Sequence, residues 1–148
     1  MSFPRLYVLL NGVVALAFGA AYFFYPVSMA SLTELELPTA AAVIDIRAFY
    51  GGQLMGLGTL AIAFAMRERL VPYGLWLTLA TLGATGIARL AGASVEGVYP
   101  WTMVLAALME IAIAGGALYL LIRPEPKKKL VKAQPAPAGP ASSSEESK

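Results

Sequence analysis

Four long apolar segments constrain the fold of this chain more than any other feature of its sequence. They cover residues 6–25, 40–66, 71–90 and 99–122. Crossing the hydrocarbon core of a membrane takes about 20 mostly apolar residues, and each segment reaches that length. A soluble core in a chain of 148 residues does not need four of them. The sequence therefore predicts an all-α protein, an antiparallel four-helix transmembrane bundle with short loops.

The composition supports a membrane protein and excludes several kinds of chemistry. Hydrophobic residues make up 58% of the chain and charged residues 14%, against roughly 45–50% and 25% in soluble domains. Histidine and cysteine are both absent, which excludes disulfides, thiol nucleophiles and histidine-ligated zinc or haem. We expect no metal and no cofactor. A short basic tail without interleaved aromatic residues also gives no indication of nucleic-acid binding.

The first apolar segment has a second interpretation as a cleaved signal peptide. Arg5 would form its positive region, and Ala17-Phe18-Gly19 is a small-residue pattern. However, the apolar stretch continues through the aromatic residues 22–25, which makes it too long and too aromatic for a signal peptide. We therefore favour a retained membrane span.

The basic residues predict the orientation of the spans. They precede the first span, fill the link between the second and third, and follow the fourth: Arg5, Arg67, Arg69, Arg123, Lys127, Lys128, Lys129 and Lys132. The other two links carry Glu34, Glu36 and Glu96 and no base. The positive-inside rule then places both termini in the cytoplasm, and we expect a bacterial inner membrane.

The chain divides into two parts by composition. Residues 1–123 form the predicted four-span membrane domain. From residue 124 onward, Pro, Ala, Ser, Lys and Glu dominate. Such a composition cannot bury enough apolar surface to fold, so residues 124–148 are predicted to form a disordered cytoplasmic tail.

Ionisable side chains lie within the spans or at their ends, where a charge is costly. Asp45 and Arg47 open the second span, Arg89 ends the third, and Glu110 lies inside the fourth. Helical side chains lean toward their own N-terminus. On adjacent antiparallel spans, Arg89 and Glu110 therefore lean toward each other, and we expect an ion pair or a water-bridged contact. Glu110 is then either a structural partner that sets the register of two spans or a proton- or substrate-binding carboxylate.

A larger polar cluster is predicted in the outer half of the bundle. Its members would be Arg47, Tyr50, Arg89 and Glu110. Arg47 could be neutralised by Asp45, Glu34 or Glu36. Arg47 and Arg89 reach about the same depth, so together they form a candidate clamp for an anionic headgroup or substrate; alternatively, Arg47 simply extends to the interface. Inside the spans, further polar groups that we interpret as hydrogen-bonding contacts between helices are Asn11 and Gln53.

Small residues in the second span predict close helix packing. Ala48, Gly52 and Gly56 are spaced four apart, which places them on one face of a regular helix. Gly51 and Gly58 widen that face. Such a face can serve inside one bundle or between two molecules.

The stretch Asp45-x-Arg47-Ala48-x-Tyr50-Gly51-Gly52, with Leu57-Gly58 further along, resembles the family of domain of unknown function 4345 (DUF4345), small bacterial four-helix membrane proteins. Asn11, Arg89 and Glu110 also occur where the polar residues of that family are expected. The resemblance covers about residues 4–123. It implies a four-span integral membrane protein without an assigned activity. The chain has a more distant similarity to DoxX-like proteins, some of which are accessory subunits of quinone-linked oxidoreductases.

Three functions are compatible with these features. The first is a structural or accessory membrane component, which would contact the lipid bilayer and either a membrane-protein partner or a second copy of itself. The alternative is binding or transport of a lipid or small anionic molecule through an outer-side site of Arg47 and Arg89. A membrane enzyme is the least supported, because Glu110, Asp45 and Tyr50 would have to perform all the chemistry. We therefore assign no catalytic residues.

Overall fold

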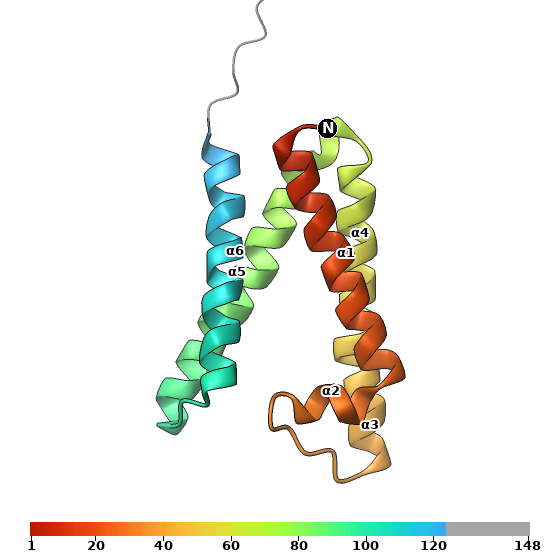
Figure 1. The fold of residues 1–148 in the computed structure, drawn as a ribbon, viewed down its shortest axis with the longest axis vertical. Coiled ribbons are helices and arrows are strands. Elements are labelled where there is room, and N and C mark those ends of the chain that lie inside the picture. Colours follow the sequence, from red (N-terminus) through yellow and green to blue (C-terminus); the bar gives the residue numbers. More distant parts are fainter. Residues whose placement is uncertain (124–148) are drawn as a thin grey trace, which may run out of the picture.

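The computed structural model describes residues 1–123, which are helical and contain no strand. Four membrane-length helices follow one another, formed by Phe3–Phe24, Ala40–Ala65, Glu68–Glu96 and Trp101–Ile122, and each is long and apolar enough to cross a membrane. They alternate in direction along the chain (Figure 1). The all-α, four-span prediction is therefore confirmed. The predicted tail, with its cluster of Lys127, Lys128, Lys129 and Lys132, lies outside the described residues.

The first helix, α1 (Phe3–Phe24), begins with a proline in its first turn and ends at Tyr25. Proline suits that position because its missing N–H would have no partner inside the helix. A short helix, α2 (Pro26–Ser31), follows and leads into the loop before the second span.

The second span is not one regular helix. It consists of α3 (Ala40–Ile46), a π-helical turn η1 (Arg47–Gly52) and α4 (Gln53–Ala65). At the end of η1, the backbone N–H of Gln53 donates to the carbonyl of Ala48, five residues earlier. A π-turn contains about one residue more than an α-turn. Side chains before and after η1 therefore do not keep the i, i+4 register that the sequence analysis assumed.

The third span also differs from its prediction. After the short η2 turn (Glu68–Leu70), α5 (Val71–Glu96) continues past residue 90, where the sequence analysis ended it, and stops before Gly97. Gly97 has φ 67°, a left-handed conformation that favours glycine at the end of a helix. Arg89 thus lies inside α5, about two turns before its end. The last helix is α6 (Trp101–Ile122).

The helices are arranged as two antiparallel pairs. One pair is α1 with η1 and α4, and the other is α5 with α6. Figure 1 shows that the pairs meet near the N-terminus and diverge toward the opposite end. We call the end with the N-terminus and η2 the narrow end. The wide end contains α2, α3 and the turn between α5 and α6.

The hydrophobic core lies at the narrow end, where all four spans contribute to it. Its buried members come from the start of α1 and α5 and the end of α4 and α6: Val8, Ala61, Ala65, Val71, Leu75, Ala117 and Leu120. Among the described residues, the main contacts between the two pairs join α5 to α1 and α4. The two helix pairs therefore share a core at the narrow end and diverge toward the wide end (Figure 1).

Glycines bring α1 close to the second span. A Cβ atom added at Gly58 would lie 2.6 Å from the backbone nitrogen of Leu16, and one added at Gly19 would lie 2.6 Å from the backbone nitrogen of Met55. A Cβ atom added at Gly51 would lie 3.1 Å from the backbone nitrogen and Cα of Phe23. These contacts involve backbone atoms, so no side-chain rearrangement could make room for a methyl group.

The predicted stripe of Ala48, Gly52 and Gly56 is not the packing face within this chain. A Cβ at Gly56 would meet nothing within 4 Å, and one at Gly52 would meet only the carbonyl of Arg47, at 3.9 Å. Ala48 is exposed. The face that contacts α1 instead runs through Gly51 and Gly58, which are seven residues, or about two helical turns, apart.

Candidate functional site

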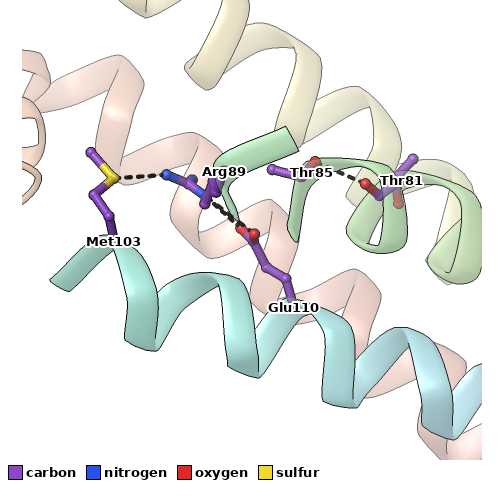
Figure 2. Close-up of polar contacts among 5 residues, drawn as sticks. All are labelled: Thr81, Thr85, Arg89, Met103 and Glu110. Carbon is purple, nitrogen blue, oxygen red and sulfur yellow. Dashed lines mark hydrogen bonds and ion pairs between the residues drawn. The ribbon is translucent and has the colours of Figure 1, made fainter. Parts of the chain in front are cut away.

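Arg89 and Glu110 form an ion pair between α5 and α6. The Nε atom of Arg89 donates to both carboxylate oxygens of Glu110, at 3.2 Å to Oε1 and 3.1 Å to Oε2 (Figure 2). The Nη1 atom of Arg89 lies 3.3 Å from Sδ of Met103. The side chains of Arg89 and Glu110 are 25% and 18% exposed. The contact expected from the sequence is thus present and only partly buried.

The local structure explains why these two side chains meet. The helices α5 and α6 are joined by a short turn and run antiparallel, so side chains that lean toward their own N-termini converge. Gly86, one turn before Arg89, allows the close approach. A Cβ at Gly86 would lie 3.0 Å from the carbonyl oxygen of Ala107 and 3.3 Å from Cβ of Glu110.

The ion pair retains unused hydrogen-bonding capacity. A guanidinium has five N–H donors and a carboxylate has about four lone-pair sites. Only the Nε donor of Arg89 is bonded to an oxygen within residues 1–123. Two nearby hydroxyls do not add to the pair. The hydroxyl of Thr85 donates to the carbonyl of Thr81 at 2.8 Å (Figure 2), and that of Thr81 donates to the carbonyl of Leu77 at 2.7 Å. The site is electrically neutral and can both donate and accept further hydrogen bonds.

Two tyrosines form a second polar group on the other helix pair. The rings of Tyr22 on α1 and Tyr50 on η1 have centroids 5.1 Å apart. Tyr22 is buried, and Tyr50 is 41% exposed. The two tyrosines thus lie on the pair formed by α1 and the second span, whereas the ion pair lies on the α5–α6 pair.

Tyr22 was not among the site residues predicted from the sequence. Tyr22 was a member of an interfacial aromatic run, and no local pattern distinguishes it from residues 23–25. Its pairing with Tyr50 depends on η1, which brings Gly51 against Phe23 and so sets the α1–η1 contact.

The remaining predicted site residues lie apart from the ion pair. Arg47 and Asp45 are both exposed, and no ion pair joins them to each other or to Glu110 within residues 1–123. Asn11 donates from Nδ2 to the carbonyl of Tyr7 in its own helix, at 2.9 Å. Gln53 is exposed. The structure therefore divides the predicted cluster between two helix pairs and does not bring Arg47 into contact with Arg89.

Two shallow pockets lie beside these groups. One, of about 260 Å³, is at the wide end and is lined by Arg89, Gly92, Ala93, Glu96, Val98, Pro100 and Met103. The other, of about 220 Å³, lies between α1 and α6 and is lined by Tyr7, Leu10, Asn11, Val14 and Ile113. We call this second pocket the α1–α6 groove.

A hydrogen bond at the α1–α6 groove joins the two helix pairs. The hydroxyl of Tyr7 donates to the backbone carbonyl of Ile113. Gly116 makes room for this contact, because a Cβ there would lie 2.7 Å from the Tyr7 hydroxyl oxygen. The groove is thus bounded by a direct contact between α1 and α6.

The described part of the chain holds no group of three His, Cys, Asp or Glu side chains that could bind a metal ion. What the arrangement offers is a neutral pair of opposite charges, two tyrosine hydroxyls and an adjoining apolar groove. These groups can bind a ligand or a neighbouring protein through hydrogen bonds and charge.

Comparison with known proteins places the chain in a family. No curated protein and no solved structure matches it. The family model described as "Domain of unknown function (DUF4345)" matches residues 3–121, nearly all of the described membrane region. The chain therefore belongs to the DUF4345 family.

Proposed function

We propose that this protein is an accessory component of the bacterial inner membrane, and that its Arg89–Glu110 pair holds the α5–α6 hairpin in register. The observation that supports this proposal is the direct contact between the guanidinium and the carboxylate, at 3.1 Å. Removing one partner of an ion pair within a membrane span leaves the other charge uncompensated, which is costly. Two opposite charges that neutralise each other between neighbouring helices have the expected character of a structural element.

The outward face of α4 is the proposed contact with a partner. Gly52 and Gly56 are spaced four apart, and neither is used for packing inside the chain. Small residues at this spacing allow two membrane helices to approach closely. The sequence analysis left open whether this face acts within the bundle or between molecules, and the packing of Gly51 and Gly58 against α1 favours the second use.

The basic residues support a cytoplasmic narrow end. Arg5, Arg67, Arg69 and Arg123 lie there, and Glu34, Glu36 and Glu96 lie at the wide end. Under the positive-inside rule, this charge distribution favours a cytoplasmic location for the start of α1 and the end of α6. A single cysteine in place of Arg67 should be protected from an impermeant maleimide in intact spheroplasts, whereas one in place of Glu96 should react. The opposite labelling pattern would reject this orientation.

Infrared difference spectroscopy in lipid vesicles tests the role of the ion pair. We expect Glu110→Gln to remove a carboxylate band, as a structural pair between a carboxylate and the guanidinium of Arg89 requires. Glu68→Gln, at the exposed η2 turn, is the matched control for loss of a carboxylate elsewhere. Loss of a protonated carboxyl band that titrates near neutral pH would contradict the structural role and favour proton-coupled transport.

Photo-crosslinking in native membranes tests the accessory role. A photoreactive amino acid at Leu60, which is exposed and lies four residues after Gly56, should give one discrete protein adduct. Trp76, exposed on α5, is the control position. Lipid adducts alone at both positions would reject a protein partner at this face, and an adduct of twice the chain mass would identify a second copy as the partner.

A second candidate function is the binding of a lipid at the wide end. It is favoured by the pocket of about 260 Å³ that Arg89 lines at the wide end, and by the unused hydrogen-bonding capacity of the ion pair. The Arg47–Arg89 clamp for an anion has less support, because Arg89 already has Glu110 as its counter-ion and Arg47 lies on the other helix pair. A ligand at this site has to bind next to both charges of the Arg89–Glu110 pair, which is neutral as a whole.

A further inference from the structure

Polar and apolar features follow one another from the wide end inward. The Arg89–Glu110 pair lies beside the wide-end pocket, which Arg89 lines. Ile113 lies three residues after Glu110 on α6, about 4.5 Å further from the wide end, and it lines the α1–α6 groove with Leu10 and Val14. Along α6, the charged pair therefore comes first and the apolar groove follows it.

The charge balance of the site restricts what it can bind. An anion bound to Arg89 would also approach the carboxylate of Glu110, and a cation bound to Glu110 would approach the guanidinium of Arg89, since the two groups are 3.1 Å apart. In a membrane, such uncompensated charges are costly. A group that carries one positive and one negative charge avoids both penalties, because each of its charges can face the opposite member of the pair.

The unused hydrogen-bonding groups match the same kind of ligand. The Nη2 atom of Arg89 has no partner within residues 1–123, and Glu110 accepts only from Nε of Arg89. A phosphate accepts from a guanidinium. A primary ammonium has three N–H donors that a carboxylate can accept. The headgroup of an ethanolamine phospholipid contains both.

We propose that the wide end binds one zwitterionic phospholipid with a primary amine in its headgroup, taken from the membrane leaflet at that end. The phosphate lies toward Arg89, the ammonium lies toward Glu110, and one acyl chain enters the α1–α6 groove. A lipid of this leaflet has its headgroup near the membrane surface and its chains toward the midplane, in the same order as the site. This inference rests on the second candidate function and goes beyond the structural role of the ion pair.

Lipid retention measured by native mass spectrometry tests the proposal. The purified full-length protein is incubated in detergent with equal amounts of palmitoyl-oleoyl phosphatidylethanolamine, phosphatidylcholine and phosphatidylglycerol. We expect the ethanolamine lipid to be retained about tenfold better than the choline lipid, which lacks N–H donors, as loss of hydrogen bonds to a charged group predicts. Equal retention of all three lipids would overturn the proposal and indicate only non-specific surface lipid.

Charge variants test the role of Glu110 by a change in selectivity. Glu110→Gln removes the negative charge and leaves Arg89 without its counter-ion, so the preference should shift from the ethanolamine lipid to the anionic glycerol lipid. Glu36→Gln, in the exposed loop at the same end, is the matched control and should leave the preference unchanged. An unchanged preference in Glu110→Gln would overturn the headgroup assignment.

Groove variants test the acyl-chain site without changing any charge. Val14→Trp fills the groove and should reduce retention of the ethanolamine lipid, whereas Val13→Trp, at a neighbouring position that does not line the groove, should not. Equal retention by these two variants would overturn the groove as the chain site. The crosslinking test at Leu60 reports on a different face, so failure of the lipid site and failure of the accessory role give separate results. A photoreactive amino acid at Val14 should crosslink to lipid. A protein adduct at that position would instead identify a partner helix as the occupant of the groove.

Discussion

Adding one methyl group at Gly58 tests how closely α1 packs against α4. In Gly58→Ala, the new Cβ would lie 2.6 Å from the backbone nitrogen of Leu16 and 2.7 Å from the carbonyl oxygen of Gly12. Both neighbours are backbone atoms of α1. The clash can therefore be relieved only by moving α1 and α4 apart.

The size of that movement follows from the contact distances. Ordinary Cβ contacts begin near 3.4 Å, so a contact of 2.6 Å requires a separation of about 0.8 Å. A gap of about 0.5–1 Å already loses a quarter to a half of the dispersion energy of each contact pair. Inserting extra carbons into a well-packed interior typically costs about 1–3 kcal/mol, and we expect Gly58→Ala to lose stability in that range.

Gly56→Ala is the matched control for this variant. It lies in the same helix, only two residues away, and a Cβ there would meet nothing within 4 Å. Both substitutions gain the same helix propensity, about 1 kcal/mol for glycine to alanine. The difference between the two variants therefore measures the packing contact alone, while Gly56→Ala should be neutral or slightly stabilising.

Thermal denaturation in detergent, followed by circular dichroism and by size exclusion of the soluble fraction, measures the effect. We expect the Tm of Gly58→Ala to lie several degrees below that of Gly56→Ala, as a loss of 1–3 kcal/mol predicts. Because the chain has no cysteine, spin labels can be placed on α1 and α4 to measure their separation. Equal Tm values with an unchanged separation would refute the packing argument.

Two further substitutions test contacts at the narrow end. Arg5→Gln removes a hydrogen bond of 2.7 Å from Nε to the carbonyl of Ala65 at the end of α4. This loss should lower the free energy of unfolding by about 1–2 kcal/mol. The Tm of Arg5→Gln should therefore lie below that of the exposed control, Arg69→Gln. Tyr7→Phe removes the hydrogen bond to Ile113 between the helix pairs. It should cost about 1 kcal/mol and broaden the α1–α6 distance distribution in pulsed electron paramagnetic resonance, whereas Tyr119→Phe should not.

The amino-acid pattern alone was enough to predict the spans and one long-range contact. Each apolar segment has to be helical in a membrane, because only internal hydrogen bonds satisfy its backbone there. Short links then make neighbouring spans antiparallel. Given that order, the direction in which helical side chains lean is sufficient to bring Arg89 and Glu110 together. These predictions succeeded because they depend on the lengths of helices and links and on which helices are neighbours.

Other features depended on helix contacts that no local pattern specifies. The second span contains two candidate glycine faces, and only its contact with Gly12 and Gly19 of α1 selects Gly51 and Gly58 over Gly52 and Gly56. The π-turn η1 shifts the register in the same region and places Tyr50 against Tyr22. When two faces of a helix are both apolar and only about 100° apart, the hydrophobicity pattern does not indicate which of them packs against a neighbouring helix.

The sequence by itself determined that the chain forms four helices able to span a membrane, in an order that pairs α5 with α6. The tertiary structure alone decided that the helices form two pairs joined at the narrow end, where Val8, Leu75 and Ala117 share one core. Lipid tails are as apolar as leucine, so hydrophobicity does not drive membrane helices together. Their arrangement is set by close packing and hydrogen bonds, and those depend on which atoms of distant segments meet.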